Sequence, residues 1–128
     1  MDLKDYFEST DGLGILSTAD TDGNVDSAIY ATPHVISEDT IGFIMRSRLS
    51  LENVQQNPNA VYMYIEKGPG YQGRRLYLKK IHQEDNPEIV QQYRRASHGH
   101  GGGDESEASF VHFRITHIRP LVGDKEQE

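Results

Sequence analysis

Two arginines and two serines lie together where a predicted strand leads into a predicted helix. They are Arg46, Ser47, Arg48 and Ser50, within the segment MRSRLSLENVQQNP at positions 45–58. The free N–H groups and the positive dipole end of a helix start favour an anion. Arginine adds paired, charge-assisted hydrogen bonds to phosphate oxygens. The junction therefore predicts a phosphate site, while the alternative is a surface arginine pair beside Glu52 with Ser50 as the helix cap.

Histidine is the other residue type with chemical potential, because the chain has six histidines and no cysteine. The absence of cysteine from the sequence excludes thiolate zinc sites, iron–sulfur clusters and a cysteine nucleophile. His98 and His100, with the nearby acids Asp104, Glu105 and Glu107, have the side chains of a transition-metal site. Their glycine neighbours leave the ligands unheld, so we expect an exposed loop and no metal site.

His34 follows Pro33 in a segment that is otherwise apolar or small. It could donate a proton to a ligand bound beside that segment. A hydrogen-bonded structural role is the favoured alternative. No catalytic residue is assigned from the sequence.

The elements that must position these residues are mostly strands, with two or three short helices. We expect helices over 2–9, from 49 to Pro58 and over 87–96, and strands over 13–19, 25–36, 40–45, 60–65, 74–83 and 110–118. Turn signals at 22–24 and 38–39 give hairpin-length connections, which require antiparallel pairing. Pro33 inside the second strand implies an edge or a bulge. The predicted fold is mainly β: a six-stranded antiparallel split β-barrel.

Length and charge limit the function classes. The 128 residues suit one domain, expected over 1–123, with a flexible loop at 98–109 and an acidic tail at 124–128. The net charge of -7 argues against a nucleic-acid partner. No segment approaches the roughly 20 apolar residues of a membrane span, so we expect a cytoplasmic protein. The modest apolar content of 35% favours dimerisation.

The order of short motifs resembles the pyridoxamine 5'-phosphate oxidase-like, FMN-binding split-barrel family. The motifs are GILST at 14–18, DG at 22–23, the small-residue stretch at 27–32, RSRLS at 46–50, NP at 57–58, GRRLYL at 73–78 and FRI at 113–115. The resemblance extends over roughly residues 12 to 122. Leu49 and Ser50 stand where the family's phosphate cluster usually has a lysine. The resemblance therefore supports the cofactor more strongly than the substrate.

The resemblance implies an FMN cofactor held at a homodimer interface. The implied contacts are Arg46, Arg48 and Ser50 to the phosphate, Ala28, Ile29 and Tyr30 to the flavin ring, Ile44 and Met45 near the ribityl chain, and Gln72 and Arg74 from the other subunit. The implied function is an FMN-dependent oxidoreductase acting on a small-molecule substrate or electron donor. Two alternatives stay open: a non-catalytic flavin carrier or sensor, and a haem-binding split barrel.

Overall fold

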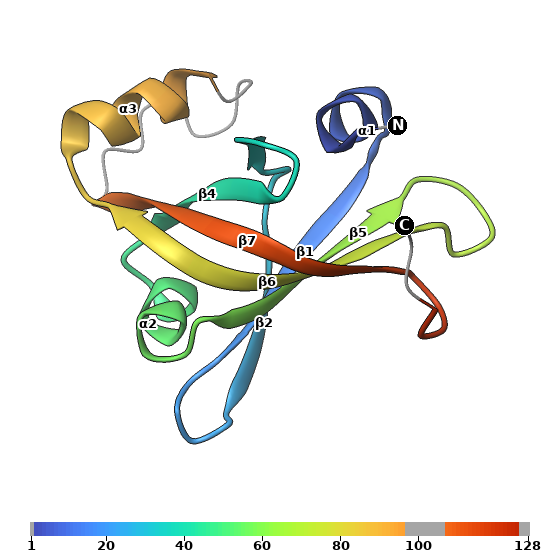
Figure 1. The fold of residues 1–128 in the computed structure, drawn as a ribbon, viewed down its shortest axis with the longest axis horizontal. Helices are drawn as coiled ribbons and strands as arrows, with labels where there is room; N and C mark the ends of the chain where they lie inside the picture. The colour runs from blue at the N-terminus through green and yellow to red at the C-terminus, as the bar shows by residue number, and fades with distance from the viewer. Residues whose placement is uncertain (1, 97–106, 126–128) are drawn as a thin grey trace.

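The structure is a computed structural model, and it describes residues 2–96 and 107–125 (Figure 1). The strands are β1 Gly12–Ala19, β2 Val25–Ile29, β3 His34–Val35, β4 Thr40–Arg46, β5 Asn59–Glu66, β6 Gly73–Glu84 and β7 Ala108–Pro120. The helices are α1 Leu3–Ser9, α2 Leu49–Gln56 and α3 Pro87–Ala96. None of the helices in these ranges is long and apolar enough to cross a membrane.

The strands form one antiparallel sheet in the order β2-β1-β5-β6-β7-β4-β3, and the sheet is not closed. The mainly β, antiparallel prediction is confirmed, but residues 2–96 and 107–125 form seven strands where six were predicted. The strand predicted over 25–36 is two strands, because β2 pairs with β1 and β3 pairs with β4. Pro33, which has no N–H to donate, lies between them. The barrel is therefore open between its edge strands β2 and β3, and the segment 30–33 crosses this split.

The inner face of the curled sheet holds the core, and the strands alternate as a half-buried sheet requires. In β1, Leu16 and Thr18 point inward, and in β5 the inward residues are Ala60, Tyr62 and Tyr64. The core also takes Ile41, Phe43, Met45, Leu76, Leu78, Val111 and Phe113 from the other strands. The core is thus strongly aromatic. Its rings meet mainly edge-on, a favoured geometry for aromatic pairs.

The start of β7 is buried on both faces. Phe110 and Val111 both have 0% exposure, although neighbouring residues of a strand point to opposite faces. Val111 faces the core, whereas Phe110 stacks on Tyr93 of α3 with ring centroids 3.8 Å apart. Residues 108 and 109, predicted as part of a flexible loop, belong to β7. Most of that predicted loop, at 98–106, lies outside the described residues, as does the tail at 126–128.

Helix α2 begins without a side-chain cap. Arg48 is the N-cap residue and makes no capping hydrogen bond, so Ser50 is not the helix cap that the alternative to a phosphate site required. Ser50 lies inside the first turn and is buried. Further along the helix, the Asn53 amide donates to the Thr18 hydroxyl at 3.0 Å, which attaches α2 to β1. The middle of α2 is therefore held against β1.

Candidate functional site

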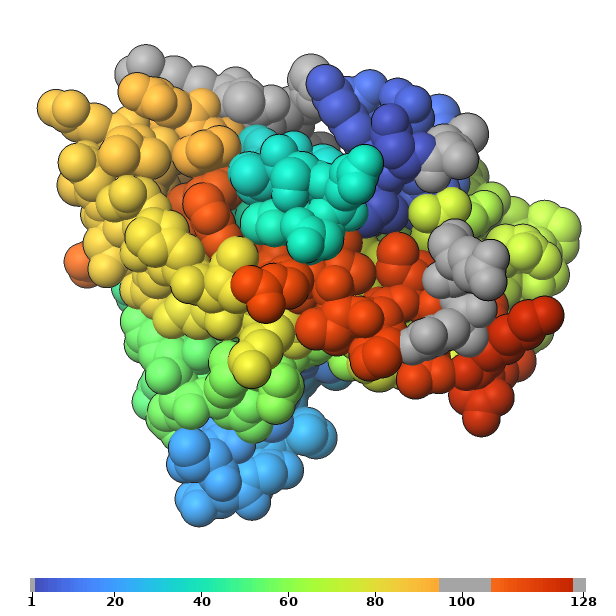
Figure 2. All heavy atoms as spheres, in the orientation of Figure 1, coloured from blue at the N-terminus to red at the C-terminus, as the bar shows by residue number. Residues whose placement is uncertain are grey.

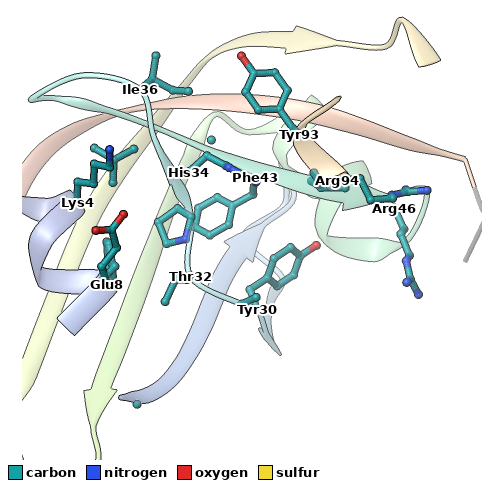
Figure 3. Close-up of a pocket in the computed structure, with 17 residues that line it drawn as sticks. Lys4, Glu8, Tyr30, Thr32, His34, Ile36, Phe43, Arg46, Tyr93 and Arg94 are labelled. Carbon is teal, nitrogen blue, oxygen red and sulfur yellow. The ribbon is translucent and has the colours of Figure 1, made fainter. Parts of the chain in front are cut away.

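A cleft of about 950 Å³ opens where the barrel is split (Figure 3). Its size is within the range of small-molecule and cofactor sites. Its floor comes from the segment 30–36 and from β4, and α1 and α3 supply its two ends (Figure 3). The lining residues are Lys4, Phe7, Glu8, Gly12, residues 30–36, Gly42, Phe43, Ile44, Arg46, Tyr93 and Arg94.

One end of the cleft is cationic and centres on Tyr30. Ser50 hydrogen-bonds to the Tyr30 side chain. The positive charges of Arg48 and Arg46 lie close enough to favour the ionised form of Tyr30. Burial raises the pKa of Tyr30, and the Ser50 bond and the two arginines offset part of that rise. The tyrosine hydroxyl points toward the end of the cleft that holds Arg46 (Figure 3). The junction residues singled out in the sequence thus converge at this end.

The middle of the cleft is aromatic. Tyr30 and Phe43 meet edge-on with ring centroids 5.8 Å apart, and His34 meets Tyr93 edge-on at 5.5 Å. Burial lowers the pKa of His34, because a half-buried imidazole is harder to charge. These walls can accept a flat ring, and the arginines at one end can accept an anion attached to it.

The floor of the cleft is held from below by Tyr62. Its hydroxyl lies 3.2 Å from the Tyr30 carbonyl oxygen and 3.1 Å from that of Ala31. The N–H of Tyr30 donates to the Gly14 carbonyl at 3.0 Å. The segment that crosses the split is thus attached to both β1 and β5.

The structure brings some of the predicted site residues together and separates others. Tyr30, Ile44 and Arg46 line the cleft, with Arg48 and Ser50 beside Tyr30. Met45 is fully buried in the core. Ile29 is 72% exposed on β2, and Ala28, half-buried next to it, does not line the cleft.

Gln72 and Arg74 also lie away from the cleft lining, near the turn between β5 and β6. The Arg74 guanidinium sits 4.0 Å from the centroid of the Tyr6 ring, and the Gln72 amide bonds to the Gly70 carbonyl. Their contribution to the site of a second subunit stays a prediction.

Sequence reasoning missed the residues that the helices supply. Lys4, Phe7 and Glu8 come from α1, and Tyr93 and Arg94 come from α3. Where each helix lies on the sheet depends on long-range packing, which local patterns do not reveal. The available signal was the spacing of Val90 and Tyr93, three residues apart, which puts both on one helix face.

No group of three metal-ligating side chains forms within residues 2–96 and 107–125. His82 and His112 face each other across β6 and β7 with ring centroids 5.1 Å apart. His98 and His100 lie outside the described ranges, so the expectation for them stays untested.

An open antiparallel barrel with a cleft at its split is a split β-barrel. Solved structures of known proteins share this architecture. No family model and no curated sequence matches the chain. An FMN-binding protein from Syntrophomonas wolfei subsp. wolfei has a TM-score of 0.76 and 19% identity, with 94% of this chain and 84% of that chain covered. A candidate pyridoxamine 5'-phosphate oxidase from Lactobacillus delbrueckii has a TM-score of 0.70 and 12% identity, with 93% of each chain covered.

A haem-binding protein from Mycobacterium smegmatis also shares the architecture. Its TM-score is 0.62 and its identity 14%, over 94% of this chain and 53% of that chain. The chain has the pyridoxamine 5'-phosphate oxidase-like split-barrel fold. The resemblance identified from the sequence is thereby confirmed at the level of the fold.

Proposed function

We propose that the protein binds FMN in the cleft, with the phosphate at the Arg46–Arg48 end and the flavin ring against the segment 30–34. The observation that carries the proposal is the convergence of Arg46, Arg48 and Ser50 on Tyr30 at one end of an aromatic cleft. A phosphorylated planar ring has the matching charge and shape. An FMN-binding neighbour with the same fold adds support.

The reaction class that suits such a site is electron transfer. When FMN is bound, it supplies the redox chemistry, while the protein positions it and tunes it through nearby charges and hydrogen bonds. The phosphate contacts anchor one end of the cofactor. The cleft beyond the ring, toward α1, then receives a small-molecule substrate or electron donor. We therefore propose an FMN-dependent oxidoreductase.

The proposed site is completed by a second copy of the chain. The outer face of the sheet carries a row of apolar side chains, because Ile15 pairs with Ile29 on one side and with Met63 on the other. Ile29 is 72% exposed and Leu13, on the same face, is 45% exposed. An exposed apolar patch of this kind suits a subunit interface. Gln72 and Arg74 are the residues proposed to reach the partner's flavin.

Comparing FMN with riboflavin tests the phosphate site directly. The two ligands differ only in the phosphate, so the wild-type protein should bind FMN more tightly. Arg48→Ala should weaken FMN binding about ten- to a hundredfold, the value of a charged hydrogen bond, and leave riboflavin binding nearly unchanged. Flavin fluorescence titration measures both affinities.

Arg114→Ala is the matched control, because Arg114 is exposed on β7 and does not line the cleft. It should bind FMN as the wild type does. Equal FMN affinity for Arg48→Ala and wild type would refute the phosphate site. Oxidation of NADH or NADPH by the FMN-loaded protein then separates an oxidoreductase from a flavin carrier or sensor.

Haem is the second candidate ligand, because His34 lines the cleft and a haem-binding protein shares the fold. Neutral imidazole is a common axial ligand of haem iron. Added haemin would give a sharp Soret band that His34→Ala abolishes. A band of equal strength in both proteins would exclude His34 as the ligand.

A further inference from the structure

We propose that Tyr62 is a positioning residue for the ligand: its buried hydroxyl fixes the segment that crosses the split and thereby sets the floor of the cleft. The inference rests on the proposed function, in that the cleft is taken as the cofactor site. Tyr62 itself does not line the cleft. It therefore acts through the backbone of Tyr30 and Ala31.

The hydroxyl of Tyr62 is placed between two carbonyl groups. The oxygen–oxygen distances are 3.2 Å to Tyr30 and 3.1 Å to Ala31. A phenol has one proton, so the two carbonyls share it in a three-centre bond. Tyr62 has 0% exposure, and burial raises its pKa well above the ordinary value for tyrosine. The hydroxyl therefore stays protonated as a donor.

The Tyr62 hydroxyl is the hydrogen-bond donor to two carbonyl groups that would otherwise need a paired strand. The ladder between β1 and β2 ends at Ile29, after which the Tyr30 N–H makes one further bond to the Gly14 carbonyl. Beyond it comes Pro33, which has no N–H. The carbonyls of Tyr30 and Ala31 thus lie past the end of the ladder. Tyr62 supplies the donor that the ladder no longer provides.

Gly14 makes this arrangement possible. A Cβ atom at position 14 would overlap both the Tyr62 hydroxyl and the Tyr30 carbonyl oxygen. Glycine at 14 thus allows β1, the Tyr62 side chain and the crossing segment to meet at one point. Gly14, Tyr30 and Tyr62 are far apart in the sequence, yet they contact one another beneath the cleft.

The hydrogen bonds of Tyr62 affect ligand binding through Tyr30. The same residue whose carbonyl is held by Tyr62 has its side chain bonded to Ser50, near Arg48. Ala31, Thr32 and His34 follow along the cleft lining. Release of the two carbonyls would therefore shift both the phosphate end and the ring wall of the cleft.

The test compares Tyr62→Phe with Tyr64→Phe. Tyr64 is two residues along β5 on the same inward face, is 3% exposed, and donates its hydroxyl to the Thr10 carbonyl at 2.7 Å. Each variant keeps its ring and loses one buried hydroxyl, so both should lose stability to a similar extent. Only Tyr62→Phe should weaken FMN binding, by about three- to tenfold, and alter the visible circular dichroism of the bound flavin.

Amide hydrogen exchange gives a second measurement that needs no ligand. The Tyr30 amide should exchange faster in Tyr62→Phe than in wild type or Tyr64→Phe, because its bond to Gly14 loses the support beside it. Failure of wild type to bind FMN would refute the proposed function alone, and exchange would still decide the role of Tyr62. Unchanged Tyr30 exchange in Tyr62→Phe, or equal loss of FMN binding in both variants, overturns the inference.

Discussion

At the scale of the single residue, His34 in the cleft should make the stability of the protein depend on pH. It is half-buried against the rings of Tyr93 and Phe110, and burial lowers its pKa below the ordinary 6.5. The unfolded chain therefore takes up a proton at a higher pH than the folded protein does. Because the unfolded state binds more protons as pH falls through 6.5, the free energy of unfolding should decrease there. Denaturant unfolding at about pH 7.5 and about pH 5.5 measures the change.

Two variants separate His34 from the other histidines. His34→Phe should reduce the dependence of the unfolding free energy on pH. Burial also lowers the pKa of His112, so a smaller slope of the same sign should remain. His117→Gln, at an exposed position on β7, should keep the wild-type slope. A His34→Phe slope equal to that of wild type would contradict the assignment.

At the scale of the element, a buried polar pair contributes to the attachment of α2 to β1. Asn53 is 4% exposed and Thr18 is 3% exposed, with the amide nitrogen 3.0 Å from the hydroxyl oxygen. Asn53→Ala should lower the free energy of unfolding by about 1–3 kcal/mol, because it leaves a buried hydroxyl without its donor. Urea unfolding measures the loss. Gln55→Ala, at an exposed position of the same helix, should change it by less than about 0.5 kcal/mol, and equal losses would contradict the role of the pair.

The element scale also shows where sequence reasoning succeeds and stops. Strand alternation and turn residues are local, so the antiparallel strands and the helices α1, α2 and α3 could be predicted. The position of Pro33 signalled an irregularity, but whether the strand bends or divides depends on which neighbours pair on each side. β3 pairs with β4, and β4 pairs with β7 from the far end of the chain. Such pairings are set by packing of the whole sheet.

The same limit applies to the candidate site. Arg46, Arg48 and Ser50 lie within five consecutive residues, and helix-start chemistry is local, so their convergence was predictable. Tyr62 was recognisable only as an inward strand residue. Its two carbonyl partners lie about thirty residues earlier in the chain. Contacts of that range become visible only once the fold is known.

At the scale of the whole molecule, two properties of the protein have opposite effects on dimer formation. The β1–β2 hairpin projects from the body of the protein (Figure 2), and it carries Val25 at 81% exposure and Ile29 at 72%. These apolar side chains favour contact with a second chain. The net charge of -7 on each chain opposes it through mutual repulsion. Salt screens the repulsion while leaving apolar burial intact, so the proposed dimer should strengthen as ionic strength rises.

Ile29→Lys tests whether the apolar outer face is the subunit interface. Ile29 is largely exposed within one chain, so the substitution should leave the fold intact, yet it would place a charge inside the proposed interface. The variant should sediment as a monomer at concentrations where the wild type is a dimer. Ile81→Lys, at another exposed apolar position on β6, should stay dimeric. A monomeric wild type that binds FMN tightly would show that one chain forms the whole pocket and that Gln72 and Arg74 take no part in it.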